Sequence, residues 1–178
     1  FYFSGDDCGS FDSEFGTMKP YVVAMTGASG AVYGVRLVQV LAGLGKEVVL
    51  VISEPARLVI REEMNISLKS FTRPEELSRV FGSQAASRMT ACSPKDFCAP
   101  IASGSYPVEG MIIIPCSMGT LGAIASGVSQ NLIHRAADCV LKEGRTTRVL
   151  VERFQAGEDI LERLNDMARR HHVTAGSV

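Results

Sequence analysis

The stretch Tyr21–Gly45, which reads YVVAMTGASGAVYGVRLVQVLAGLG, decides the fold of this chain. It opens with an unbroken apolar run, Tyr21–Met25, of the kind that forms a buried strand. The small residues Thr26–Gly30 then predict a tight turn, and apolar side chains recur at helical spacing from Ala31 to Leu44. Gly45 follows, at the position where glycine commonly ends a helix. We therefore expect a strand, a tight turn and a helix in succession.

The same succession recurs along the rest of the chain. Each expected strand is an unbroken apolar run, a pattern typical of a parallel sheet with helices on both faces. The sequence therefore predicts an α/β fold with a parallel sheet. Further strands are expected at Glu47–Ile52, Gly110–Ile114 and Arg148–Val151, and helices at Pro55–Met64, Pro74–Phe81, Leu121–Ala125, Leu132–Lys142 and Ala156–His171, with a long loop before Ala99.

The 178 residues suit a single domain with one hydrophobic core. Residues 1–17 are rich in Gly, Ser, Asp and Phe without any period, so we expect a disordered extension or a cloning remnant, with Met18 as the native start. They lack the cationic segment and apolar run of a signal peptide. Residues 18–151 are expected to form the main domain, and residues 152–178 an atypical C-terminal helix.

Composition argues against several classes of function. The net charge of −1 gives no basic excess for binding nucleic acid or an anionic membrane. No apolar run is long enough to span a bilayer. The five cysteines form no CxxC pair, and their spacing to the three histidines does not suggest zinc. We expect reduced thiols, a cytoplasmic protein and no metal.

Small and polar residues follow the expected strands, at the sheet edge where α/β proteins bind ligands. After the first strand, Gly27–Gly30 would let a ligand approach the backbone closely, and the N–H groups of the next helix suit a phosphate. A turn that binds no ligand has the same pattern. Ser53 follows the second strand, where it either hydrogen-bonds a ligand or caps the next helix.

The segment Pro115–Thr120 follows the third strand, and its Ser117 and Thr120 supply hydroxyls and backbone donors. Cys116 would be a nucleophile if the helix N-terminus lowered its pKa. No histidine stands in a recognisable partnering motif, so we favour an unreactive thiol.

Two cations further along the chain suit a phosphorylated ligand. Arg135 and Lys142 are two helical turns apart and so share one face of the expected helix. The alternative is a solvated basic face, with Asp138 and Glu143 as the partners of the two cations.

Together these segments resemble the UbiX-type flavin prenyltransferase family. The motifs occur in the family's order and cover roughly Pro20 to Arg145. They are TGASGAVYGVRL (Thr26–Leu37), DFCAPIASGS (Asp96–Ser105), PCSMGTL (Pro115–Leu121), NLIHRAAD (Asn131–Asp138) and LKE (Leu141–Glu143).

The resemblance implies a flavodoxin-like or Rossmann-like three-layer sandwich that binds FMN without metal and forms a homo-oligomer, a dodecamer in the family. It implies transfer of a dimethylallyl group from dimethylallyl monophosphate to reduced FMN, which makes the prenylated FMN that UbiD-type decarboxylases use. The implied FMN-binding residues of domain 18–151 are Gly27, Ala28, Ser29, Ser53, Ser103, Ser105, Ser117, Met118, Gly119, Thr120 and Arg135. The implied catalytic residues are Ser29, Arg135, Lys142 and Arg153.

The match decays past Arg145. Arg153 aligns with a family arginine only if one residue is inserted, and Phe154 then stands where the family has its acid/base glutamate. The alternative is therefore an FMN-binding flavoprotein without prenyl transfer. A flavin-dependent decarboxylase of cysteine-derived carboxylates ranks lower, because that family relies on an early histidine and none precedes His134.

Overall fold

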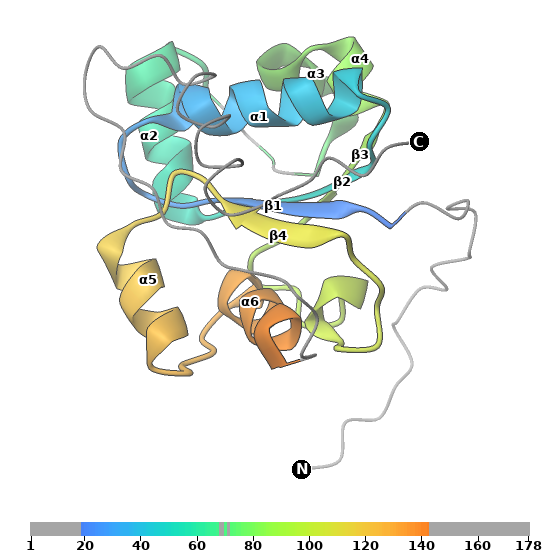
Figure 1. Cartoon of the computed structure of the whole chain (residues 1–178). Coiled ribbons are helices and arrows are strands. Elements are labelled where there is room, and N and C mark those ends of the chain that lie inside the picture. The colour runs from blue at the N-terminus through green and yellow to red at the C-terminus, as the bar shows by residue number, and fades with distance from the viewer. Residues whose placement is uncertain (1–18, 68–69, 71, 143–178) are drawn as a thin grey trace, which may run out of the picture.

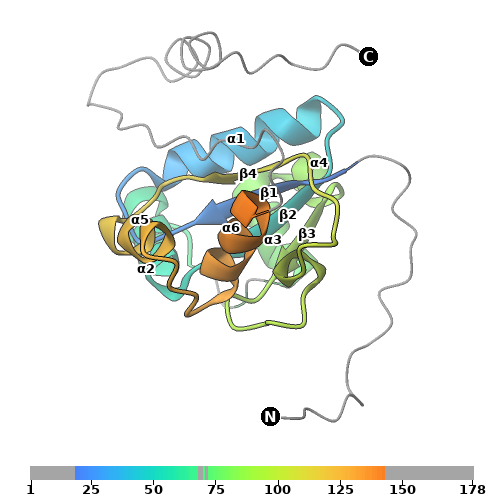
Figure 2. The same cartoon turned by 60° about the horizontal axis from the view of Figure 1, so that its bottom comes forward.

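The computed structural model describes residues 19–67, 70 and 72–142. The strands are β1 (Tyr21–Met25), β2 (Val48–Ile52), β3 (Met89–Cys92) and β4 (Gly110–Ile113), and the helices are α1 (Ala31–Gly43), α2 (Glu54–Met64), α3 (Pro74–Phe81), α4 (Ser83–Ala86), the 3-10 helix η1 (Pro100–Ala102), α5 (Met118–Ala125) and α6 (Leu132–Lys142). The strands form one parallel sheet in the order β3-β2-β1-β4. Helices α1 to α4 cover one face of the sheet, and α5 and α6 cover the other (Figures 1 and 2).

This arrangement confirms the predicted α/β sandwich with a parallel sheet. Strands β1, β2 and β4 and helices α1, α2, α3 and α6 coincide with the expected segments to within one residue. The long loop expected before Ala99 is wrong, because that region contains α4 and β3. The expected strand Arg148–Val151, the expected helix Ala156–His171 and the N-terminal extension 1–17 lie outside the described residues.

Each face of the sheet has its own hydrophobic core. In β1, Val23 and Met25 pack with the helices of the first face, whereas Val22 and Ala24 pack with α6 and η1. All four side chains are at most 1% exposed. Because neither face of β1 meets water, no position along it favours a polar residue, which accounts for its unbroken apolar sequence.

The strand order reverses beside β1. The chain passes from β1 through β2 to β3 on one side, and then places β4 on the other side of β1. Ligands of open α/β proteins bind outside the carboxyl ends of the strands at such a switch point. The segments that leave β1 and β4 at this point are Thr26–Gly30 and Pro115–Thr120, so the fold brings two motifs identified in the sequence to one place.

Gly34 allows α1 to lie directly on the ends of these two strands. A Cβ atom at this position would lie 2.5 Å from the carbonyl oxygen of Ile114 and 2.8 Å from Cε of Met25. The first of these atoms belongs to the backbone and has little freedom to move. Helix α1 can therefore approach the switch point this closely only because Gly34 has no side chain.

We predict that Gly34→Ala lowers the free energy of unfolding by about 1–3 kcal/mol, because the added methyl group overpacks this contact. Urea unfolding would measure the change. Gly43→Ala is the matched control, since nothing lies within 4 Å of a Cβ at Gly43. In Gly43→Ala the free energy of unfolding should rise by about 0.5–1 kcal/mol, because alanine loses less backbone entropy on folding than glycine does. Equal effects of the two variants would contradict the close approach at Gly34.

Candidate functional site

Thr26 ties the segment after β1 to the segment after β4. Its Oγ1 donates a hydrogen bond to the carbonyl oxygen of Pro115 (2.8 Å) and accepts one from the backbone N–H of Ser117 (2.7 Å). The backbone N–H of Thr26 donates to the same Pro115 oxygen (3.0 Å). Thr26 is only 2% exposed. Water therefore does not compete with these bonds, and they fix the two segments relative to each other.

The segment after β4 is capped by its own serine. Ser117 Oγ accepts a hydrogen bond from the N–H of Thr120 (3.3 Å) and donates one to Thr120 Oγ1 (3.0 Å). With its N–H bonded to Thr26, Ser117 acts as the N-cap of α5. The predicted role of Ser117 and Thr120 as ligand donors therefore competes with bonds that they already make within the protein.

The first turn of α5 presents two backbone donors. The first N–H groups of a helix have no partner within it, and among the described residues no acceptor is found for those of Met118 and Gly119. Met118 is 79% exposed, and a Cβ on Gly119 would meet nothing within 4 Å. This turn is therefore accessible to an anionic or carbonyl group of a ligand, which the positive end of the helix dipole favours.

The N-terminus of α1 is closed, in contrast, by Glu63. The N–H of Gly30 donates to Glu63 Oε1 (3.0 Å), and the N–H of Ala31 donates to Oε2 (2.8 Å). The position at which a ligand phosphate is expected is thus taken by a carboxylate of the protein. Sequence analysis missed Glu63, because this residue lies in the last turn of α2 and meets α1 only through the packing of the two helices.

Ser53, which follows β2, and Gly27, which follows β1, lie where the segments after these two strands pack against each other. The N–H of Ser53 donates to the carbonyl oxygen of Met25 (3.0 Å), and its Oγ accepts from the N–H of Ala56 (3.2 Å). Ser53 is therefore the N-cap of α2, one of its two expected roles. A Cβ on Gly27 would collide with Pro55. The absence of a side chain at Gly27 thus lets the β1 segment pack against the start of α2.

The switch-point segments Thr26–Gly30 and Pro115–Thr120 form a first group of residues, and Ser103 and Ser105 do not join it. Their hydroxyls lie 2.8 Å apart beside η1. The small cavity next to Ser103 is also lined by Val22 and Cys139. Val22 lies in the first half of β1, roughly 15 Å along the chain from Gly27 at about 3.3 Å per residue. These serines therefore lie well away from the switch-point segments of the same chain.

Arg135 bonds to the residue that precedes Ser103, and Ser103, Ser105 and Arg135 therefore form a second group. Its Nε donates to the carbonyl oxygen of Ala102 (2.9 Å), and its guanidinium pairs with Asp138 (3.1 Å). Pairing with Asp138 is the alternative that the sequence left open. No described hydrogen bond links Arg135 to the switch-point segments. The side chain of Lys142 and the whole of Arg153 lie outside the described residues.

The cysteine and histidine near these segments are not activated. Burial raises the pKa of the Cys116 thiol, and a weaker hydrogen bond to the backbone lowers it only in part. This agrees with the unreactive thiol favoured from the sequence. His134 is 6% exposed and accepts a hydrogen bond from the N–H of Gln130 (3.4 Å), and burial lowers its pKa. The imidazole is therefore neutral near pH 7.

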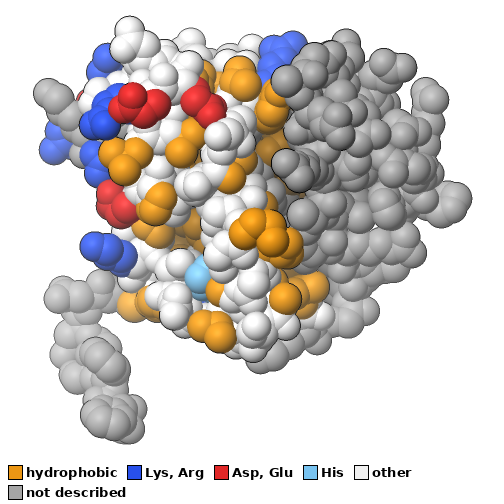
Figure 3. Space-filling model, turned by 90° about the vertical axis from the view of Figure 1, so that its left-hand side faces the viewer, with side chains coloured by type: hydrophobic (Ala, Val, Ile, Leu, Met, Phe, Trp, Pro, Cys, Tyr) orange, Lys and Arg blue, Asp and Glu red, His pale blue; other side chains and the backbone are white. Residues whose placement is uncertain are grey.

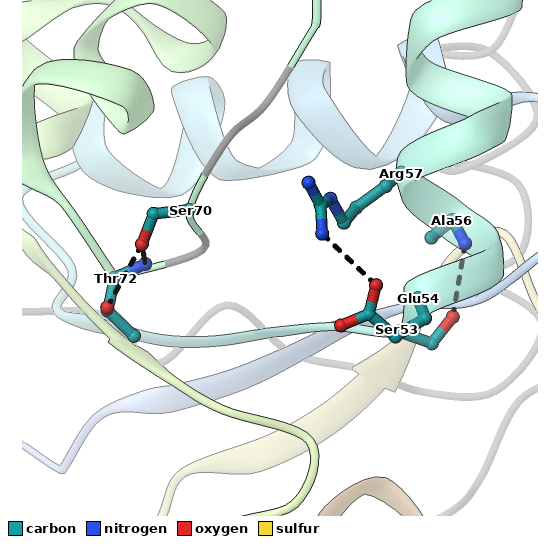
Figure 4. Close-up of polar contacts among 6 residues, drawn as sticks. All are labelled: Ser53, Glu54, Ala56, Arg57, Ser70 and Thr72. Carbon is teal, nitrogen blue, oxygen red and sulfur yellow. Dashed lines mark hydrogen bonds and ion pairs between the residues drawn. The ribbon is translucent and has the colours of Figure 1, made fainter.

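A hollow of about 440 Å³ lies along α2, beside Pro55. It is lined by Arg57 and Arg61, and Figure 4 shows Arg57 paired with Glu54 (3.1 Å) across from Ser70 and Thr72. Both arginines have carboxylate partners, since Arg61 pairs with Glu62 (2.8 Å). The hollow is thus of mixed charge, unlike the uncharged segments at the switch point.

No helix among the described residues is long and apolar enough to cross a membrane. The same residues contain no cluster of three or more His, Cys, Asp or Glu side chains that would hold a metal ion.

Residues 13–152 match the family model of flavoproteins, so the chain belongs to the flavoprotein family. Within this family it belongs to the UbiX-type proteins, since it is 45% identical over 142 residues to the flavin prenyltransferase UbiX of Alkalihalophilus pseudofirmus, a match that covers 80% of this chain and 69% of that protein. It is 49% identical over 125 residues to the flavin prenyltransferase UbiX of Halalkalibacterium halodurans, a match that covers 70% of this chain and 59% of that protein. The chain thus spans less than two thirds of the length of this relative.

Two solved structures are similar over most of the chain. One is a dodecameric FMN-dependent UbiX-like decarboxylase from Escherichia coli O157:H7, with 34% identity and a TM-score of 0.62 over 86% of this chain and 76% of that one. The other is AnUbiX in complex with FMN and dimethylallyl pyrophosphate, with 30% identity and a TM-score of 0.61 over 90% of this chain and 84% of that one. Both agree with the flavodoxin-like fold expected from the sequence.

We predict that Glu63→Gln lowers the free energy of unfolding by about 0.5–1 kcal/mol, because the amide lacks the charge that interacts with the α1 dipole. The difference should shrink in 1 M salt, where such interactions are screened. Urea unfolding at low and high salt would measure both effects. Glu62→Gln is the control, because the exposed Glu62–Arg61 pair contributes little. A Glu63 variant that behaves like this control would show that the carboxylate does not close α1.

Proposed function

We propose that this protein is a flavin prenyltransferase, which moves a dimethylallyl group from dimethylallyl monophosphate to N5 and C6 of reduced FMN. The observation that carries the proposal is the meeting of two uncharged, small-residue segments, Thr26–Gly30 and Pro115–Thr120, at the switch point of the sheet. The chain's similarity to UbiX of H. halodurans and to the FMN-bound AnUbiX supports it.

The first group of residues fits a bound flavin mononucleotide. Gly27, Ser29 and Gly119 are exposed and leave the backbone accessible. In the proposed complex the N–H groups of Met118 and Gly119 would hold an anionic or carbonyl oxygen of the flavin, a role that α1 does not share because Glu63 closes it. When bound, reduced FMN would supply the nucleophilic atoms that accept the prenyl group. The protein would hold the ring and exclude water from it.

Departure of phosphate from the prenyl donor needs cationic groups. Arg135 is the described cation assigned to this step, and Ser103 and Ser105 lie in the same second group. Lys142 and Arg153 complete the proposed set outside the described side chains. Within one chain the second group lies apart from the flavin segments, so we propose that assembly of several copies brings the two groups together.

The surface of α5 supports such an assembly. This helix buries none of its residues, and the segment Met118–Gln130 contains no charged side chain. Figure 3 shows hydrophobic side chains spread over this face, while the charged side chains lie along its left and upper parts. We propose a homo-oligomer in which α5 contacts another copy, as the dodecameric E. coli relative makes reasonable. The proposed location is the cytoplasm, and the product would pass to a UbiD-type decarboxylase.

The second candidate is a flavoprotein that binds FMN without prenyl transfer. It is favoured by Phe154, which stands where the family's acid/base glutamate is expected. Loss of general acid/base help would lower the rate by about 10²–10⁴-fold.

The first test is anaerobic incubation of the protein with reduced FMN and dimethylallyl monophosphate. We predict that the mass of the bound flavin rises by one prenyl group, as measured by mass spectrometry after denaturation. Bound but unmodified FMN would support the second candidate, and no bound flavin would refute both.

In the same assay Ser29→Ala should lower prenyl transfer more than FMN affinity, because Ser29 is assigned to the reacting centre. Equal loss of both would contradict this role.

A second test concerns the α5 surface. We predict that Ala125→Glu dissociates the assembly, because a carboxylate on this uncharged face would have to be buried without a partner. Analytical ultracentrifugation would measure the change. Gln84→Glu is the control, since it adds the same charge at an exposed position of α4. If Ala125→Glu assembles like the parent protein, another surface makes the contact.

A further inference from the structure

Thr26 is the least accessible polar residue near the proposed flavin site. It follows β1 directly and precedes the exposed residues that are assigned to the ligand. Its 2% exposure means that its hydroxyl cannot touch a bound flavin in place of Gly27 or Ser29. Any effect of Thr26 on the ligand must therefore act through the residues to which it is bonded.

Its hydroxyl satisfies one donor and one acceptor of the segment that follows β4. The Ser117 N–H has Thr26 Oγ1 as its acceptor, at 2.7 Å. The Pro115 carbonyl oxygen receives both the hydroxyl and the backbone N–H of Thr26, at 2.8 and 3.0 Å. Ser117 is the residue from which α5 starts. The threonine hydroxyl thus sets where the first turn of α5 lies relative to the end of β1.

The same residue also shapes the β1 segment. The N–H of Ala28 donates to the carbonyl oxygen of Thr26 (2.9 Å), which bends the chain immediately after β1. The carbonyl group of Thr26 therefore fixes the turn at Gly27–Ser29 through Ala28, and its hydroxyl fixes the start of α5 through Ser117. The N–H groups of Met118 and Gly119 lie one and two residues beyond the bonded Ser117, so their direction depends on this link.

We infer that Thr26 is a positioning residue for the flavin, in that its buried hydroxyl sets the separation of the two segments that hold the ligand. The inference rests on the proposed flavin site and adds a residue that does not itself contact the ligand. Valine has nearly the shape of threonine but no hydroxyl. Thr26→Val would leave the Ser117 N–H without its acceptor, and the segment would move to find another.

The test compares variants by FMN affinity, measured by fluorescence quenching well below the unfolding temperature of each. Thr26→Val should weaken FMN binding about tenfold or more, because the shifted segment would no longer present the Met118 and Gly119 N–H groups at the right separation from the β1 segment. Thr26→Ser keeps the hydroxyl and loses only the methyl group, so it should bind FMN within about twofold of the parent protein. Should the valine variant not fold, Thr26→Cys keeps a side chain of similar size with only a weak S–H donor.

A control separates positioning from stability. Val80→Ala removes buried methyl groups in α3, which contributes no residue to either segment, and lowers the unfolding temperature without moving the site. It should leave FMN affinity unchanged. The inference is overturned if Thr26→Val lowers the unfolding temperature but binds FMN like Val80→Ala, or if Thr26→Ser binds more weakly than Thr26→Val. Failure of the parent protein to bind FMN would refute the proposed function instead, and that measurement comes first.

Discussion

A single buried hydroxyl joins the two halves of the candidate site. Thr26 and Pro115 are 89 residues apart in sequence, yet the threonine bonds to the segment after β4 through both its side chain and its backbone. The parallel pairing of β1 with β4 brings the two strand ends to the same edge. Strand pairing alone, however, leaves the segments beyond the strands free to diverge. The Thr26 hydroxyl fixes the two segments relative to each other at the point where the strand order reverses.

Helices α1 and α5 both begin at this edge, and the N–H groups at their positive ends have different partners. Glu63 supplies the counter-charge for α1 from within the chain, whereas the first N–H groups of α5 have no acceptor among the described residues. An anion that arrives at the edge would meet repulsion at one helix and open donors at the other. The geometry therefore gives an elongated anionic ligand one preferred direction, although the two starting motifs look equally suitable in the sequence.

Much of the fold could be predicted from the sequence, because β1 and β2 are buried on both faces and so contain only apolar residues. Edge strand β3 could not, since three of its four residues are only partly buried and Thr90 interrupts its apolar run. The members of the switch-point site were also predictable, as they follow strand ends. Glu63 was not, because only the packing of α2 on α1 brings it there. Nor did the sequence reveal that Ser103 and Arg135 lie apart from the switch-point segments, since motif order carries no information on distance.

The lack of buried side chains in α5 has a consequence for the order in which this region becomes rigid. A helix of eight residues is too short to be stable alone and normally depends on packing against a core. Helix α5 has its serine cap and only partly buried side chains, so we expect its local opening free energy to lie at the low end of the range within the molecule. A ligand at its first turn and a neighbour on its outer face would each raise that energy, and each would then favour the binding of the other. If the proposed cofactor and the proposed neighbouring copy both bind at α5, cofactor loading and assembly would be coupled through the folding of one short helix.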